Sequence, residues 1–130
     1  MTVQEWVDAY AQAWRERDAD AAAALFTEDS VYRAHPLQEP HRGQAGVQTY
    51  WSDVTATQDR VDVRMGRPVE STDGRRAAVE FWVRMLSGGA DVTLIGILFL
   101  RFAGDGRCED LLETWLFEPG DHPPHEGWGT

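Results

Sequence analysis

The sequence contains no lysine and only one cysteine, and it has no long apolar run. The absence of lysine excludes a lysine Schiff base or a lysine general base. The lone cysteine, Cys108, cannot form an internal disulfide, which is typical of a reducing compartment, so we expect a cytoplasmic location. No apolar stretch approaches the roughly 18 residues that a membrane helix requires. The N-terminus also lacks the basic-then-apolar pattern of a signal peptide.

Positive charge is scarce as well. The 12 basic residues, all arginine, face 22 acidic residues and give a formal net charge of −10. A surface of this sign repels nucleic-acid phosphates and anionic lipids, so neither nucleic acid nor membrane is an expected partner. No phosphate loop, dinucleotide fingerprint or zinc spacing is present. His122 and His125 in the tail have no accompanying ligand pattern, and we expect no metal and no cofactor.

The chain has enough apolar residues for one core. Hydrophobic residues make up 42% of the 130 residues, and six of them are tryptophans. A domain of this size can hold a core without disulfide or metal staples. We expect a single domain over residues 1–130, with an irregular tail over 118–130 because prolines and glycines interrupt it. We expect Trp128 to dock the tail on the body of the domain.

The first part of the chain has helical periodicity. Apolar residues from Val3 to Trp14 recur at spacings of three and four, which predicts an amphipathic helix. Thr2 is its expected N-cap, and Glu5 completes a capping box. The further expected elements are a second helix over 21–26 that starts at Asp18 or Asp20, a turn over 27–30, a strand over 31–34 and a third helix over 43–55.

Four strand-like segments with intervening turns follow, over 61–65, 76–86, 92–102 and 107–117. Helices followed by a meander of strands indicate an α+β fold with a mainly antiparallel sheet. The segment 92–102 is apolar on both faces, whereas helices can cover only one. We therefore expect a homodimer through the convex sheet face, which Glu80, Trp82 and Arg84 would share.

The stretch from Tyr32 to Gly43 is expected to cross the mouth of a cavity. Pro36 biases His35 toward an extended conformation at the end of a strand. Histidine titrates near neutral pH, so His35 is a candidate general base. The alternative is a loop histidine that hydrogen-bonds to backbone and shapes the turn.

Glu113 is a candidate acid or base on the last strand. Its neighbours on the same face, Leu111 and Trp115, are apolar. A carboxylate in such a position is costly to bury unless it is paired or protonated. If the side chain points inward, its pKa should be perturbed; the alternative is an ion pair with a neighbouring arginine.

Aromatic residues suggest a pocket for a flat, apolar ligand. Tyr10 could donate a hydrogen bond to a substrate oxygen, or it could belong to a plain aromatic core stripe. The residues that we expect to line or fill the pocket are Trp14, Tyr32, Trp51, Leu98, Leu111 and Trp115.

Several strings, taken in order, resemble a known family. They are W-x-x-x-Y-A-x-A-W-x-x-x-D-x-D-A-x-A-A-L-F-x-x-D-S-V-Y, then P-H-R-G before the third helix, then R-F-x-x-D-G-R in the last hairpin. Together they are similar to the nuclear transport factor 2-like superfamily, and within it to SnoaL-like proteins, which include polyketide cyclases and relatives of ketosteroid isomerase. The resemblance implies a cone-shaped roll. In it, three N-terminal helices pack in a strongly curved sheet around an apolar cavity, often in a dimer.

The isomerase relatives imply roles for individual positions. Their hydrogen-bonding tyrosine matches Tyr10, and their aspartate base falls on Ala34 or His35, depending on the direction of counting. Their second aspartate corresponds to Leu98, so that acid is missing and steroid isomerisation is disfavoured. The inward positions of the last strand match Leu111, Glu113 and Trp115.

The combined interpretation is a cofactor-independent pocket protein for a small, apolar, oxygenated molecule. As an enzyme it would transfer a proton or close a ring next to a carbonyl. His35 would take the proton, Tyr10 would donate to the oxyanion and Glu113 would assist. The alternative is a non-catalytic binding or dimerising domain. Convergent polar groups in an open cavity favour the enzyme, and a cavity closed by tryptophans favours the alternative.

Overall fold

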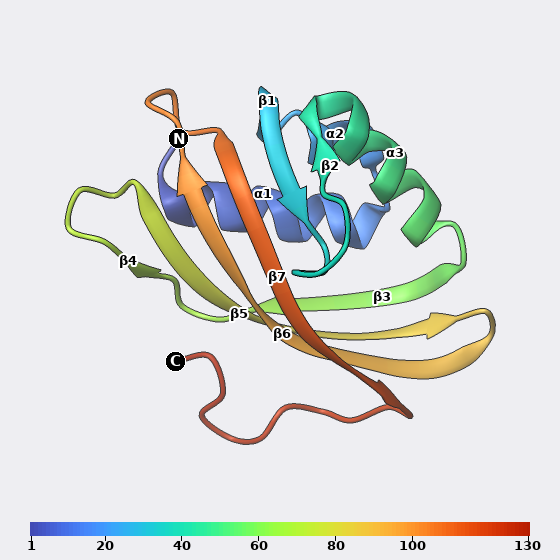
Figure 1. Ribbon diagram of the computed structural model, residues 1–130. Helices are drawn as coiled ribbons and strands as arrows, with labels where there is room; N and C mark the ends of the chain where they lie inside the picture. Colours follow the sequence, from blue (N-terminus) through green and yellow to red (C-terminus); the bar gives the residue numbers. More distant parts are fainter.

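In a computed structural model that describes all 130 residues, three helices lie on one face of a curved seven-stranded sheet (Figure 1). The helices are α1 (Val3–Glu16), α2 (Ala19–Ala23) and α3 (Gly43–Thr55). The strands are β1 (Phe26–Arg33), β2 (His41–Arg42), β3 (Gln58–Met65), β4 (Val69–Glu70), β5 (Arg76–Ser87), β6 (Ala90–Phe102) and β7 (Cys108–Pro119). The sheet order is β2-β1-β7-β6-β5-β3, and β4 pairs with β5. The expected α+β cone with a mainly antiparallel sheet is confirmed.

Helix α1 supplies much of the core. Its expected capping box is present: Thr2 Oγ1 accepts from the Glu5 amide at 3.1 Å, and Glu5 Oε1 accepts from the Thr2 amide at 3.0 Å. The apolar face is buried against the sheet, and each large side chain buried there stabilises the fold by roughly 1.5–3 kcal/mol. None of the helices is long and apolar enough to span a membrane. The buried residues of α1 are Val3, Trp6, Val7, Tyr10, Ala11, Ala13 and Trp14.

The expected boundaries around α2 were partly wrong. Asp18 is the N-cap, because its side chain accepts from the Ala21 amide at 3.0 Å. The helix ends at Ala23, and residues 27–30 belong to β1 instead of forming a turn. The reason is a parallel pairing of β1 with β7, which lies about 80 residues away along the chain. The register of this pair shifts between Phe26 and Val31, so β1 lacks the regular alternation by which a strand is recognised.

Strands β5, β6 and β7 divide their side chains between two faces. On the inner face, Val79, Leu98 and Glu113 are neighbours across the three strands. Gly96 lies in the same inward row of β6. A Cβ atom there would overlap the Thr114 carbonyl oxygen and would lie 2.6 Å from the Phe81 ring. The glycine therefore allows the Phe81 ring to cross β6 on the inner face.

The C-terminal tail, residues 120–130, is irregular and crosses the outer face of the sheet, opposite the helices (Figure 1). Trp128 packs on Trp82 with ring centroids 5.8 Å apart, so the expected docking occurs on the outer face. The Trp82 indole donates to the His122 carbonyl at 2.7 Å, and Arg84 pairs with Asp121 at 2.6 Å. The tail thus covers the β3–β5 part of the face that we expected to be free for a partner.

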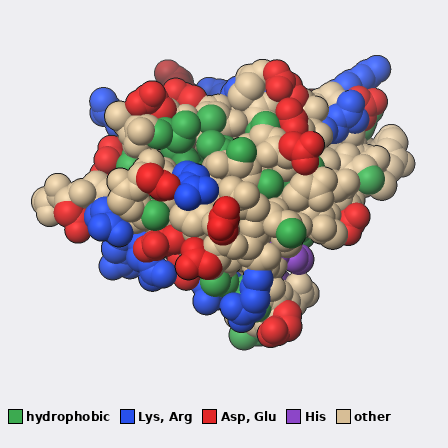
Figure 2. Space-filling view, turned by 90° about the horizontal axis from the view of Figure 1, so that it is seen from above, with side chains coloured by type: hydrophobic (Ala, Val, Ile, Leu, Met, Phe, Trp, Pro, Cys, Tyr) green, Lys and Arg blue, Asp and Glu red, His purple; other side chains and the backbone are tan.

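The opposite side of the molecule is formed largely by α2, α3 and the adjoining loops. Figure 2 shows acidic and basic side chains interspersed there with small hydrophobic patches. Apart from Val54 of α3, the large exposed apolar side chains of the regular elements belong instead to the sheet. They are Val69, Phe99, Trp115, Leu116 and Phe117.

Candidate functional site

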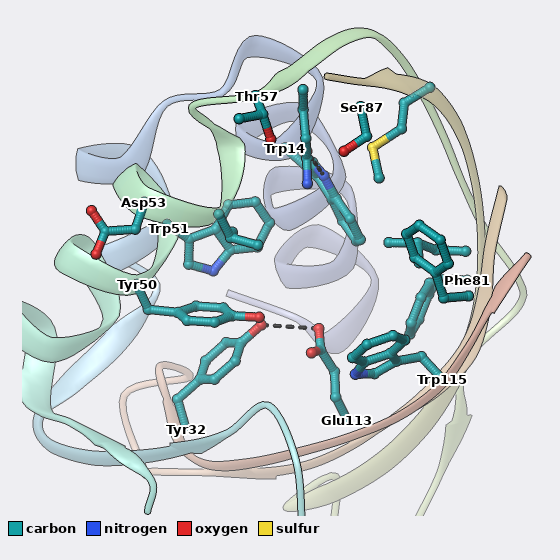
Figure 3. Close-up of a pocket in the computed structure, with 15 residues that line it drawn as sticks. Trp14, Tyr32, Tyr50, Trp51, Asp53, Thr57, Phe81, Ser87, Glu113 and Trp115 are labelled. Carbon is teal, nitrogen blue, oxygen red and sulfur yellow. Dashed lines mark hydrogen bonds between the residues drawn. The ribbon is translucent and has the colours of Figure 1, made fainter. Parts of the chain in front are cut away.

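A pocket of about 360 Å³ lies between α1, α3 and the inner face of the sheet (Figure 3). Ten of its 15 lining residues are hydrophobic. Trp115 and Phe117 are on the inward row of β7, yet they are 46% and 50% exposed. They lie where the strands extend past the helices, so the pocket opens to solvent at that end. Its walls include Trp14 from α1, Tyr50 and Trp51 from α3, Phe81 and Met85 from β5, and Leu94 from β6.

A hydrogen-bonded row of polar groups ends in this pocket. The Tyr32 hydroxyl donates to Glu113 Oε1 at 3.0 Å, and the Tyr10 and Tyr32 hydroxyls are 3.0 Å apart. The single hydroxyl hydrogen of Tyr32 is used in the hydrogen bond to Glu113, so in the Tyr10–Tyr32 hydrogen bond Tyr10 is the donor and the Tyr32 oxygen is the acceptor. Figure 3 shows Tyr32 and Glu113 meeting at the base of the pocket, with Tyr50 beside them. Three elements, α1, β1 and β7, therefore meet at one carboxyl group.

Burial changes the acidity of this carboxyl group. Glu113 is only 6% exposed, and no arginine pairs with it. Loss of solvation raises the pKa of Glu113 to about 7, and the hydrogen bond from Tyr32 opposes this rise. The ion pair considered for Glu113 is absent, and a neutral hydroxyl is its partner.

The tyrosines around Glu113 remain protonated. Burial raises the pKa of Tyr10 and of Tyr32 well above the ordinary value, and the nearby Glu113 charge adds to this effect. Burial, followed by the same charge, also raises the pKa of Tyr50. These hydroxyls thus act as hydrogen-bond donors, while Glu113 can hold or release a proton near neutral pH.

The residues proposed for the pocket fall into two layers. Trp14, Tyr32, Trp51, Glu113 and Trp115 line the pocket. Tyr10, Leu98 and Leu111 are completely buried and do not line it. Tyr10 lies behind Tyr32, whereas Leu98 and Leu111 surround Glu113 with apolar atoms.

The His35 side chain does not line the pocket. Its Nδ1 accepts a hydrogen bond from the Leu37 amide at 3.2 Å, and its carbonyl accepts from the Gln38 amide at 3.2 Å. These are the contacts of the turn-shaping alternative. The neighbouring Ala34 carbonyl accepts from the Trp115 indole at 3.0 Å. The segment after β1 therefore holds a pocket residue in place without contributing the imidazole.

Two aromatic residues beside Tyr32 were not identified from the sequence as site residues. Tyr50 lines the pocket, and its ring lies 5.2 Å from that of Tyr32. The His41 ring packs at a tilt against Tyr50, with ring centroids 4.3 Å apart. Helical periodicity over residues 43–55 does not by itself show which side chain of α3 meets β1.

Other reactive groups are poorly placed for chemistry. Cys108 is buried, and burial raises the pKa of its thiol to about 12, so it remains a thiol. No group of three or more His, Cys, Asp or Glu side chains is gathered where it could hold a metal ion. The Glu113 pocket is thus the site whose groups are best placed for a chemical reaction.

Comparison with known proteins places the fold in a family. Residues 7–110 match the family model of the SnoaL-like domain. The chain belongs to the SnoaL-like domain family. No curated protein matches the sequence.

Several solved structures share the SnoaL-like fold of the chain. The epoxide hydrolase/cyclase-like enzyme SalBIII, described for its role in pyran ring formation in the polyether salinomycin, has a TM-score of 0.76 at 20% identity; the match covers 87% of this chain and 89% of that chain. A candidate polyketide cyclase from Pseudomonas putida has a TM-score of 0.72 at 23% identity, covering 89% and 92%. A protein from Catenulispora acidiphila with a ketosteroid isomerase-like fold, solved with trimethylamine, has a TM-score of 0.72 at 21% identity, covering 88% and 86%. At these identities the likeness shows the fold.

Proposed function

We propose that this SnoaL-like protein is a cofactor-independent enzyme of the isomerase or cyclase type, acting on a small, mainly apolar molecule with a carbonyl group. The observation that carries the proposal is Glu113, a buried carboxyl group at the base of an open apolar pocket, bonded only to Tyr32. A group with a pKa near the working pH suits both taking and returning a proton.

The reaction starts with ionised Glu113, which takes a proton from a carbon next to the carbonyl. The electron pair of the broken C–H bond then forms an enolate. In a substrate with a β,γ double bond the enolate is a dienolate, and return of the proton to its γ-carbon gives the conjugated isomer. Alternatively, the enolate carbon attacks a second carbonyl of the same molecule, and Glu113 gives its proton to the new alkoxide, which closes a ring. Both routes balance protons and electrons without a cofactor.

In this proposal Glu113 takes the role that the sequence suggested for His35. Tyr32 holds one carboxyl oxygen, and Tyr10 acts as a positioning residue through Tyr32. The Tyr50 hydroxyl lines the same pocket and stays protonated, so it can donate to the developing enolate oxygen. The apolar walls lower the local dielectric constant around these groups, which strengthens these interactions.

Two further observations support an enzyme over a plain binding domain. Polar groups from α3, β1 and β7 converge on a cavity that is open to solvent. Two of the structures that share the fold carry cyclase descriptions, SalBIII and the Pseudomonas putida protein.

Exchange of deuterium into the ketone α-tetralone tests the proposal without knowledge of the natural substrate. The wild type should accelerate exchange at the carbon next to the carbonyl, and Glu113→Gln should lower that acceleration at least about 100-fold. His35→Ala is the control and should exchange at the wild-type rate. Binding of α-tetralone without exchange would contradict catalysis and favour the binding domain. Full exchange by Glu113→Gln would contradict the role of this carboxyl group.

A second copy of the chain is the proposed partner for the outer sheet face. The tail leaves the β6–β7 part uncovered, where Phe99 is 48% exposed and Leu116 is 57% exposed. Ile95 and Ile97 lie on the same outward row of β6 as Phe99, and both are half-buried. This area is apolar enough to be buried in a homodimer.

Sedimentation at micromolar concentration tests the dimer. The wild type should sediment as a dimer, and Leu116→Asp should sediment as a monomer, because the new charge would be buried without a partner. Val69→Asp is the control, since Val69 is 72% exposed but lies on the short strand β4. A monomeric wild type would contradict the proposal.

A further inference from the structure

The six tryptophans differ in what their indole N–H groups bind. Four of them donate to a protein oxygen: Trp6 to the Leu25 carbonyl at 2.9 Å, Trp14 to Gln58 Oε1 at 3.0 Å, Trp82 to the His122 carbonyl at 2.7 Å and Trp115 to the Ala34 carbonyl at 3.0 Å. Trp128 lies half-buried in the tail. Trp51 is the exception, because its Nε1 is completely buried and has no hydrogen-bond partner.

An unpaired buried donor is unusual and calls for an explanation. Two buried side-chain polar atoms lack a partner in this protein, Ser30 Oγ and Trp51 Nε1. Of these two residues only Trp51 lines the pocket. In Figure 3 the nitrogen of Trp51 lies on the ring edge that faces Tyr50 and the Tyr32–Glu113 pair. The free donor therefore belongs to the same chemical site as Glu113.

The packing fixes Trp51 in this orientation. Its ring makes edge-to-face contacts with Tyr10 at 5.4 Å and with Trp14 at 5.3 Å, and the residue is only 2% exposed. A ring held from two sides cannot turn its N–H group outward to water. An acceptor has to come to the nitrogen through the pocket.

We propose that Trp51 is a substrate-binding residue whose Nε1–H group donates to a neutral carbonyl oxygen and thereby selects carbonyl compounds over hydrocarbons of the same shape. This inference rests on the proposed function, whose pocket and ligand class it shares. An indole N–H is a donor only, so its partner must be an acceptor. The Glu113 charge and the net charge of −10 oppose an anionic ligand. Among neutral acceptors, the carbonyl oxygen is the one that the proposed function supplies.

A matched pair of ligands and a matched pair of variants test the inference. The ligands are α-tetralone and tetralin, which differ in the carbonyl oxygen. The variants are Trp51→Phe and Trp115→Phe; both shorten a pocket wall, but the Trp115 N–H is already bound to Ala34. Calorimetry should show that Trp51→Phe reduces the ratio of α-tetralone to tetralin affinity about five- to tenfold. In Trp115→Phe the ratio should stay within about twofold of the wild type. An unchanged ratio in Trp51→Phe would overturn the inference.

The wild-type protein provides a second readout that does not depend on a folded variant. In a heteronuclear NMR spectrum, the Trp51 indole N–H signal should shift downfield on addition of α-tetralone and should not do so with tetralin. An equal response to both ligands would contradict a hydrogen bond to the carbonyl oxygen.

The two proposals can fail separately. A shift of the Trp51 indole N–H signal without any deuterium exchange would contradict catalysis but support the binding role of Trp51. Deuterium exchange by the wild type, together with an unchanged ratio of α-tetralone to tetralin affinity in Trp51→Phe, would contradict the role of Trp51 but support catalysis by Glu113. Binding of neither ligand to the wild type would count against both.

Discussion

The inner and outer faces of the sheet surround a carboxyl group with opposite environments. On the inner face, Glu113 lies among apolar side chains, and burial raises its pKa to about 7. On the outer face, Arg84 of β5 donates to Asp121 of the tail at 2.6 Å and 3.1 Å, and this pairing lowers the pKa of Asp121. One acid is held without a counter-charge, and the other is paired in contact with water.

This difference separates reactivity from stability. An exposed ion pair contributes little to folding, about 0–1 kcal/mol. An unpaired buried acid costs stability whenever it is ionised, and it persists only when the surrounding fold holds it in place. On the inner face, ionised Glu113 thus lowers the stability of the fold. On the outer face, Trp82 and Arg84 bind the tail, which covers part of the sheet.

The largest expected effect comes from the pH dependence of stability. The pKa of Glu113 is about 7 in the folded protein and near 4.5 when solvated. Its contribution to the free energy of unfolding is therefore complete below pH ~4.5 and is lost as the pH rises through about 7. Between about pH 5 and pH 8 the wild type should lose roughly 2–3 kcal/mol more unfolding free energy than Glu113→Gln, which stays neutral.

Urea unfolding of both proteins at the two pH values measures this difference. The comparison removes the general effect of the net charge, because the two proteins share every other acidic residue. If the unfolding free energies of the wild type and of Glu113→Gln changed equally with pH, Glu113 would be solvated like an exposed acid, and the prediction would be wrong.

The next effect concerns the packing that shapes the inner face. Gly96→Ala should destabilise the fold by about 1–3 kcal/mol, because its Cβ would overlap the Phe81 ring and the Thr114 carbonyl oxygen. The matched control is Gly104→Ala, where nothing lies within 4 Å of the added atom. Thermal unfolding of both variants checks this, and equal melting temperatures would contradict the close packing of β5 on β6.

The smallest effect concerns the outer face. Trp128→Ala removes the contact with Trp82 and with Arg64, whose guanidinium lies 5.9 Å from the Trp128 ring. The loss should be about 1 kcal/mol, with deuterium exchange unchanged, because the tail does not touch the pocket. Glu126→Ala, an exposed position in the same tail, is the control. A loss of exchange in Trp128→Ala would show that the two faces are coupled.

The sequence predicts those parts of the fold that depend on neighbouring residues. The capping box at Thr2 and Glu5 and the start of α3 at Gly43 are local, and both are confirmed. The alternation of Leu111, Glu113 and Trp115 placed Glu113 among apolar neighbours, because a strand repeats every two residues.

The pairings between distant segments were not predictable in the same way. Tyr32 and Glu113 are 81 residues apart, and they meet because β1 pairs in parallel with β7. The register shift in β1 belongs to the same pairing. For this reason His35 seemed a better base from the sequence than its place in the turn supports.

Direct titration of the Glu113 side-chain carboxyl carbon by NMR tests the central claim. We expect a midpoint near pH ~7, and a higher midpoint in Tyr32→Phe, because the hydrogen bond from Tyr32 stabilises the ionised form. A midpoint near the solvated value of 4.5 would contradict a buried, proton-transferring carboxyl group and the function built on it.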